Sequence, residues 1–252
     1  MGLSSNSIIH FTGKLSNLKG ILNGGFDIRY CRETFYSKSK CRDLLVPMVS
    51  FCDTPFSQIK EHVKSYGSYG IGLSKKWAEK NGLNPVLYLE KNSTLSENIL
   101  NELYSKIKGE NDSVDKLSSS DKQAFDVLRY IKNYQGDLNR VDKKTIKDYR
   151  FSDEREWRFV MNTNIKQRPF AMIPETTTEA QTSRAKKTHN DKIKNQKLKF
   201  LPEDISYIII KSENQRDSVI QALEKANGEQ AHKAVKRLTS RIISTEQLVT
   251  DF

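Results

Sequence analysis

The stretch SIIHFTGKLSNLKGILNGGF, residues 7–26, decides the fold that we expect for this chain. Residues 7–12 are β-branched or aromatic at most positions, which predicts a short strand with His10 inside it. Apolar residues then recur at helical spacing over residues 15–22, and the glycine pair that finishes with Gly25 predicts the end of that helix. The chain is therefore expected to begin with a strand, a short helix and a glycine stop.

Strand and helix patterns alternate through much of the rest of the chain. Further strands are expected at residues 46–52, 69–73, 85–89, 156–161 and 205–211. Further helices are expected at residues 55–65, 75–81, 215–226 and 230–241, with Thr54 and Ser74 as N-caps of the first two. The run at 85–89 is apolar nearly throughout, so we expect it at the centre of a sheet.

Two polar segments interrupt this pattern. Residues from about 94 to 150 contain two amphipathic stretches joined by a polar linker, and we expect a helical insertion there. Residues from about 162 to 200 are polar and basic, and we expect a mobile loop. The remaining elements indicate a single α+β domain that covers residues 1–252.

The chain is strongly basic, with 42 Lys and Arg against 31 Asp and Glu, a net charge of +11 and a pI near 9.4. Such an excess indicates an acidic partner, and its densest part falls in the expected basic loop. The candidate nucleic-acid contacts in that loop are Arg184, Lys186, Lys187, Lys192 and Lys194. The alternative is a solvated loop without a binding role, which is common for charge runs.

Cysteine spacing and hydropathy exclude several other classes of site. Cys31, Cys41 and Cys52 form no pair with metal-ligand spacing, so we expect no metal and mostly structural thiols. The longest apolar run is too short for a membrane span, and residues 1–7 lack the features of a secretory signal. We therefore expect a cytoplasmic protein without a membrane partner.

The opening stretch resembles the start of the ADP-ribosyltransferase superfamily. The likeness is to the branch that holds poly(ADP-ribose) polymerases and DarT-type toxins, where a strand with His-x-Thr precedes a helix of the form N-x-x-x-I-L-x-x-G. His10, Thr12 and Gly25 occupy three of those places. The resemblance implies a split mixed β-sheet flanked by helices, with NAD as the substrate. It also implies that His10 and Thr12 hold a ribose of NAD and that Gly25 lets the backbone approach it.

Two later blocks extend this resemblance. In VSFCDTPFS, residues 49–57, Ser50 and Phe51 stand where the superfamily usually has an aromatic pair on its second strand. The usual tyrosine is replaced there, and Tyr66 or Tyr69 would supply the stacking ring instead.

The second block, DEREWRFV at residues 153–160, matches the strand that carries the catalytic glutamate. The resemblance gives Glu156 the catalytic role and Glu154 a part in activating the acceptor. Taken on its own, the same stretch also alternates like any half-buried strand, with Trp157 and Phe159 inward and the charges outward.

The whole chain also resembles the AbiGi family of abortive phage-infection proteins, through the pieces HFT, SFCDTP, NPVLY and IISTEQ. This likeness implies a role in phage defence and a toxin–antitoxin partner protein. The leading hypothesis is an NAD-dependent mono-ADP-ribosyltransferase, toxin-like, with nucleic acid such as RNA as its acceptor. The alternative is a non-catalytic antitoxin or regulator that binds a partner protein or nucleic acid.

Overall fold

The computed structural model describes residues 5–105, 118–140, 143–161, 171–173, 176–227 and 232–251. The chain forms two compact units, each with its own hydrophobic core. Unit 1 consists of Met1–Asp27, Val49–Asn84 and Asn195–Phe252, and unit 2 consists of Ile28–Met48 and Pro85–Lys194. The single-domain organisation stays a prediction.

Unit 1 is built on a mixed sheet in which sequence neighbours are rarely spatial neighbours. Its strand order is β15 (Ile242–Ser244), β14 (Ile205–Ile210), β5 (Tyr69–Ser74), β1 (Ser7–Thr12) and the end of β4 (Cys41–Cys52). The β14–β15 pair is parallel, whereas β5 pairs antiparallel with both β14 and β1. In the β1–β5 register, His10 lies opposite Ile71.

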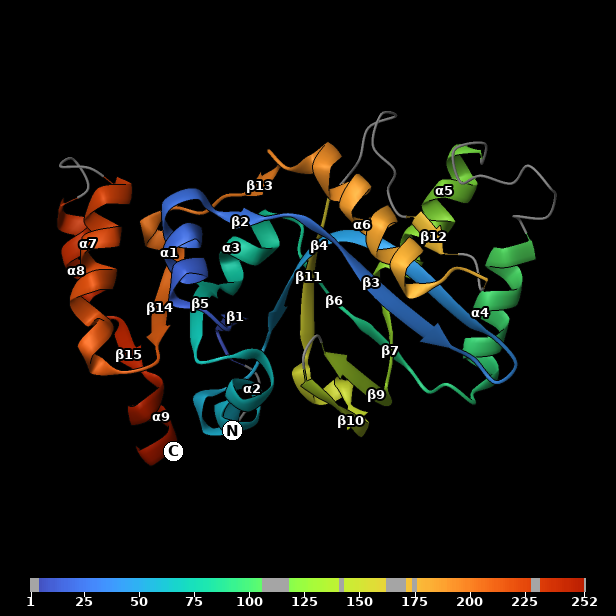
Figure 1. Cartoon of the computed structure of the whole chain (residues 1–252), viewed down its shortest axis with the longest axis horizontal. Coiled ribbons are helices and arrows are strands. Elements are labelled where there is room, and N and C mark those ends of the chain that lie inside the picture. The colour runs from blue at the N-terminus through green and yellow to red at the C-terminus, as the bar shows by residue number, and fades with distance from the viewer. Residues whose placement is uncertain are drawn as a thin grey trace. The chain divides into compact units, whose positions relative to one another are not determined.

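Helices flank this sheet, and a short strand pair completes the unit. The helices are α1 (Leu15–Gly24), α2 (Ile59–Tyr66), α3 (Lys75–Lys80), α7 (Arg216–Asn227), α8 (His232–Thr239) and α9 (Thr245–Asp251). Helix α1 lies beside α7 in Figure 1, and β2 (Phe26–Asp27) pairs with β13 (Lys197–Leu198). Ile9, Ile59, Ile209 and Leu248 form a core cluster because β1, β14, α2 and α9 turn apolar faces toward one another.

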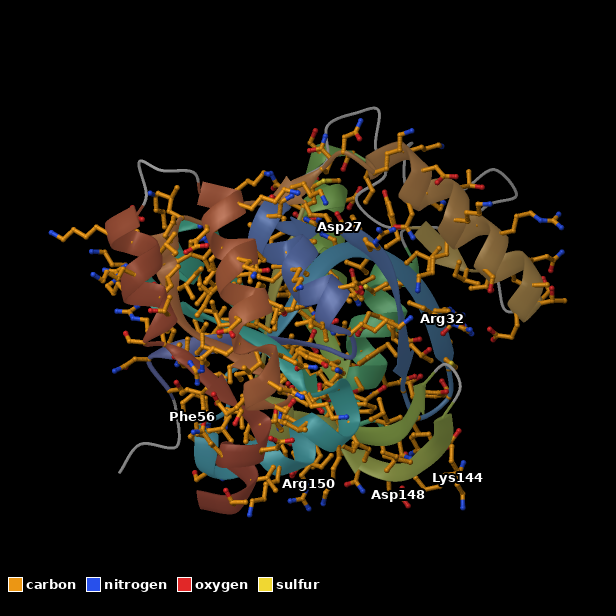
Figure 2. The ribbon with its side chains drawn as sticks, turned by 60° about the vertical axis from the view of Figure 1, so that its left-hand side comes forward. Asp27, Arg32, Phe56, Lys144, Asp148 and Arg150 are labelled. Atoms are coloured by element: carbon orange, nitrogen blue, oxygen red, sulfur yellow. The ribbon has the colours of Figure 1, made fainter. Side chains whose placement is uncertain are left out.

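Unit 2 is assembled around the first part of β4. Strand β3 (Arg29–Tyr36) pairs antiparallel with β4 over its whole length, and β12 (Ala171–Ile173), β11 (Glu156–Val160) and β6 (Asn84–Pro85) extend the pairing. Strand β7 (Leu87–Leu89) pairs in parallel with β8 (Ile131–Asn133). Strands β9 (Gln135–Arg140) and β10 (Lys143–Arg150) form a hairpin that carries Lys144, Asp148 and Arg150, labelled in Figure 2.

The helices of unit 2 are α4 (Thr94–Ser105), α5 (Ser119–Asp126) and α6 (Glu179–Ile193), with 3-10 turns at Val127–Tyr130 and Phe151–Glu154. The core of the unit lies between these elements and the β3–β4 pair, and it includes Phe35, Val46, Leu100, Leu128 and Val160. Figure 1 shows α6 running alongside β3, which agrees with the contacts between the two elements.

The α+β class is confirmed, as are several elements predicted from periodicity. Strand β1 has the predicted bounds, and β5, β11 and β14 lie where strands are expected. The cap at Ser74 is also confirmed, because its hydroxyl accepts the backbone N–H of Trp77 at 3.2 Å. Local signals therefore predict these elements correctly.

The predicted central strand at residues 85–89 is wrong. The segment divides into β6 and β7, and β7 pairs with the three-residue strand β8. The side chain of Leu87 is 46% exposed, which is incompatible with a strand buried on both faces. A short apolar run does not by itself reveal how deeply a strand is buried.

The helical insertion at 94–150 is correct only in its first half. Helices α4 and α5 lie there, but residues 131–150 form strands β8, β9 and β10. Strand β3 was not predicted at all, because its sequence RYCRETFY mixes polar and aromatic side chains without a regular apolar face. Both errors come from strands with polar side chains.

The predicted mobile loop at 162–200 is wrong over the part that the structure describes. Residues 162–170 and 174–175 lie outside the described residues, but Glu179–Ile193 is a 15-residue helix. Thr178 and Gln181 cap it reciprocally in a capping box. The predicted cap at Thr54 is also wrong, because its hydroxyl contacts His62 Nε2 at 3.2 Å instead of a helix N–H.

Candidate functional site

The acidic pair predicted as catalytic lies in unit 2, inside a buried network of charges. Strand β11 alternates as expected, but its phase is the reverse of the prediction: Glu156 and Arg158 point inward, and Trp157 and Phe159 are only half-buried. Arg158 is 0% exposed. A charged face can be turned inward here because neighbouring elements supply charges of both signs.

Arg158 is the centre of the network. Its Nε and Nη2 donate to Glu156 Oε1 and Oε2 at 2.6 and 3.2 Å, so the two residues form a bidentate ion pair within β11. Its Nη2 also donates to Glu33 Oε2 at 2.5 Å, and its Nη1 donates to the Arg129 carbonyl at 3.0 Å. The planar guanidinium thus ties β11 to β3 and to the turn before β8.

Lys132, on β8, joins the two acids to each other. Its Nζ lies 2.9 Å from both Glu154 Oε2 and Glu156 Oε2. The strand does not extend back to Glu154: a 3-10 turn ends there, and Arg155 adopts a left-handed conformation with φ +43°. Glu154 and Glu156 do lie close together, as predicted. They are brought together by the 3-10 turn and by the ammonium group of Lys132 that both contact, and not by an extended strand.

Protonation balances this network. Burial, together with the nearby Glu156 and Glu33 carboxylates, raises the pKa of Glu154 to about 9. At neutral pH Glu154 is then a protonated carboxyl group whose oxygen accepts a hydrogen bond from Lys132. The remaining charges are Glu33 and Glu156 against Arg158 and Lys132, so two anions face two cations.

The predicted nucleotide-binding group lies in unit 1. His10 Nδ1 is 2.9 Å from the carbonyl oxygen of Ser50, and its ring makes edge contacts with Phe26 and Phe51 at centroid distances of 5.1 and 5.7 Å. Burial lowers the pKa of His10 in spite of the Ser50 hydrogen bond. A neutral imidazole that donates from Nδ1 to the Ser50 carbonyl explains this arrangement.

The other predicted ligand contacts also have partners within the unit. Phe51 is 1% exposed and packs edge-on against Trp77, so its ring faces are not open to a ligand. The Thr12 hydroxyl accepts from Asn17 Nδ2 at 3.0 Å, and the Tyr69 hydroxyl accepts from Gln215 Nε2 at 3.0 Å. Tyr66 stacks against His62 at 6.1 Å between centroids.

Gly25 approaches protein backbone. Its φ is +85°, and a Cβ added there would lie 2.7 Å from the carbonyl oxygen of Leu198 on β13. The left-handed conformation that favours glycine thus lets the chain leave α1 and pair with β13.

The predicted nucleic-acid contacts divide between two faces of α6. Arg184, Lys187, Lys192 and Lys194 are exposed. Lys186 is half-buried, and its charge acts to lower the pKa of Cys31, a pKa that burial nevertheless raises to about 11.

The structure brings together Glu154 with Glu156, and His10 with Ser50 and Phe51. His10 belongs to unit 1 and Glu156 to unit 2, so the predicted cleft between them stays a prediction.

Sequence reasoning missed Glu33, Lys132 and Arg158 as members of the site. The spacing Glu-x-Arg on β11 was an available signal, because residues two apart on a strand share a face. Glu33 and Lys132 offered no comparable signal, since they come from strands far away in the sequence.

The three cysteines are free thiols. Within the described ranges, no group of three His, Cys, Asp or Glu side chains is placed to hold a metal ion. Over the same ranges, no helix has the length and apolar character needed to cross a membrane.

The fold and the site define an α+β protein whose conspicuous acids are bound in internal ion pairs. The chain belongs to the AbiGi family, whose model, described as "Putative abortive phage resistance protein AbiGi, antitoxin", matches residues 25–211. This membership gives the chain a role in abortive phage resistance and confirms that part of the sequence prediction.

A curated relative supports the same family. The "Abortive phage resistance protein AbiGi" of Lactococcus lactis subsp. cremoris is 29% identical over 222 residues, which cover 83% of this chain and 88% of the relative. No solved structure matches the chain.

Proposed function

We propose that this chain is the non-catalytic regulator, or antitoxin, of a phage-defence pair and that it acts by binding a partner protein. The description of its family names an antitoxin, which supports this half of the sequence prediction. The observation that carries the proposal is the saturation of the Glu156 carboxylate by Arg158 and Lys132.

A transferase glutamate has to accept a hydrogen bond from a ribose hydroxyl of NAD. Both Glu156 oxygens already accept bonds from charged donors, and the side chain is 5% exposed. A ribose would have to displace Arg158 or Lys132, which would leave a buried charge without its counter-ion. The arrangement is therefore better suited to stabilising unit 2 than to catalysis.

The environment of His10 supports the same conclusion. A histidine that holds a ribose needs a ring nitrogen and an open approach. In unit 1, Nδ1 is engaged by the Ser50 carbonyl and the ring packs against Phe26 and Phe51. A half-buried histidine that is hydrogen-bonded through Nδ1 and packed against aromatic rings is a common arrangement of a structural residue.

An ADP-ribosyltransferase with that superfamily's fold is the second candidate. It is favoured by the raised pKa of Glu154, because strongly perturbed carboxyl groups are frequent at catalytic sites. In this candidate NAD is the substrate, nucleic acid is the acceptor, and Glu156 is released from Arg158 before reaction.

Growth measurements separate the two candidates. Expression of this chain alone should leave bacterial growth unchanged, whereas the protein encoded beside it should slow growth. Co-expression of the two should restore growth. A chain that is itself toxic, with toxicity abolished by Glu156→Gln, would contradict the regulator proposal.

Incubation with labelled NAD, with and without RNA, provides the second readout. We expect no transfer of label to protein or RNA by the wild-type chain. Glu156→Gln is compared with Glu224→Gln, which changes an exposed acid on α7, and thermal unfolding shows whether each variant folds. Label transfer by the wild type establishes the transferase even if Glu156→Gln does not fold.

A further inference from the structure

Helix α6 is held on unit 2 by one face. Asn190 Oδ1 accepts the backbone N–H of Tyr30 at 2.8 Å, and the His189 ring lies 5.0 Å from the Tyr30 ring. Thr182 and Ile193 are buried on the same side of the helix. With the capping box at Thr178, these contacts fix the rotation of the helix about its axis, and they determine which side chains face solvent.

The opposite face carries the exposed cations Arg184, Lys187 and Lys192, and Lys194 is exposed directly after the end of the helix. At about 1.5 Å of rise per residue, Arg184 and Lys192 are roughly 12 Å apart along the helix axis. This separation lets the cations contact more than one phosphate of a nucleic-acid strand.

In the part of the chain that the structure describes, the exposed cations of α6 have no acidic partner, unlike the cations of the buried network. Within the described ranges, no ion pair joins Arg184, Lys187 or Lys192 to an acid, and Glu179, in the first turn of the helix, is bound to Arg32. By contrast, Lys132 and Arg158 each have acidic partners, and so does Lys147 on β10. The positive charge on α6 is therefore available to an external anion.

The composition of this face distinguishes between two kinds of acidic partner. The remaining exposed positions of α6 are Glu179, Ala180, Gln181, Ser183, Thr188 and Asp191, so its exposed surface contains no large apolar side chain. Interfaces between proteins have an apolar or aromatic centre, whereas interfaces with nucleic acid are polar and strongly basic. Hydroxyl and amide side chains beside cations are typical phosphate contacts.

We propose that the exposed basic face of α6 binds the phosphodiester backbone of nucleic acid. The inference goes beyond the regulator function, because it assigns a second partner to a separate surface. DNA and RNA share this chemistry, and the binding assay distinguishes them. Because the contacts are to the backbone, binding depends on salt more than on base sequence.

Fluorescence anisotropy tests the proposal with three labelled probes: a DNA duplex of about 20 base pairs, an RNA duplex of the same sequence and one single RNA strand. The wild-type chain is compared with the triple variant Arg184→Gln, Lys187→Gln and Lys192→Gln. We expect the variant to bind at least about tenfold more weakly at low salt. The slope of log affinity against log salt should fall by about 2–3, since each B-DNA phosphate that a cation neutralises adds roughly 0.9 to it.

The matched control removes three exposed cations from another helix: Lys233→Gln, Lys236→Gln and Arg237→Gln on α8. The control lowers the net charge by the same amount as the α6 variant, so it measures the general effect of charge on binding. If the site is on α6, the control should weaken binding less than about threefold.

Equal weakening of binding in the two triple variants would overturn the proposal, as would a wild-type chain that binds none of the probes at about 50 mM salt. Circular dichroism and thermal unfolding check that both triple variants are folded. Co-expression of the α6 variant with the partner protein tests the regulator function separately, because it shows whether the variant still restores growth. Failure of the nucleic-acid proposal and failure of the regulator proposal are therefore distinguished.

Discussion

At the scale of single residues, Arg158 is the side chain on which the acids of unit 2 depend. It is fully buried, and it meets Glu156 with two nitrogens and Glu33 with one of them. An arginine is suited to this position because its rigid planar group donates to both oxygens of Glu156 and still reaches Glu33, and a lysine ammonium lacks this fixed bidentate geometry.

We expect Arg158→Met to destabilise the protein by about 3–5 kcal/mol, because Glu156 and Glu33 would stay buried without their shared counter-ion. Urea unfolding measures the change in the free energy of unfolding. Adding Glu156→Gln to Arg158→Met should recover part of this stability, since it removes one of the two uncompensated charges. Lys147→Met, which breaks the exposed pair with Asp137, is the control and should have no measurable effect.

Glu154 makes the stability of the protein depend on pH. Its pKa is raised from 4.5 to about 9, so between these values the folded state holds a proton that the unfolded state has released. Stability should therefore fall as pH rises from about 5 to 9, with a slope of up to about 1.4 kcal/mol per pH unit.

Glu154→Gln replaces the protonated carboxyl group with a neutral amide of the same shape, so it should remove this part of the dependence. Thermal unfolding of the wild type and of Glu154→Gln at a series of pH values measures the difference. Parallel curves for the two proteins between pH 5 and 9 would show that Glu154 is ionised in the folded state.

At the scale of elements, the turn after α1 depends on Gly25, the second glycine of the pair that ends the helix. Gly25 has φ +85° and lies against the backbone of Leu198, whereas Gly20, within α1, has no atom within 4 Å of an added Cβ. The two positions therefore separate the effect of close packing from that of helix propensity.

Gly25→Ala should destabilise the protein by about 1–3 kcal/mol, through a strained left-handed residue and a clash with β13. Gly20→Ala should stabilise it by up to about 1 kcal/mol, because alanine is the better helix former. Chemical denaturation of both variants measures the two changes. A destabilised Gly20→Ala together with an unaffected Gly25→Ala would contradict this account of the turn.

The start of helix α6 can be predicted from a capping signal in the sequence. Thr178 and Gln181 have the spacing of a capping box, which predicts a helix start within a segment that composition alone assigns to a loop. The helix has little apolar surface, so its periodicity is weak. Its face is instead determined by Asn190 and Tyr30, a contact between residues 160 positions apart.

At the scale of the whole molecule, the chain has two compact units with separate apolar cores. The ion-pair network lies in unit 2 and the His10 group in unit 1. Family membership covers residues 25–211, which include the network and α6, and it gives the chain its role in phage resistance.

Hydrogen exchange of Arg158→Met should show whether the units unfold separately. We expect the amides of β8 and β11 to lose protection, because these strands carry the network. The amides of β1, β5 and β14 should keep theirs, since their core contains none of the affected side chains. Equal loss of protection in both units would show that they unfold as one.

The sequence by itself determined the α+β class, the strand that carries His10, the helix after it and the strand that begins with Glu156, because these depend on local periodicity and turn residues. It also indicated the family, through short motifs spread along the chain. Only the tertiary structure decided that Arg158 faces inward, that Lys132 and Glu33 complete its surroundings, and that one face of α6 is exposed. The physical reason is that burying a charge requires counter-charges from distant strands, and periodicity within one strand carries no information about them.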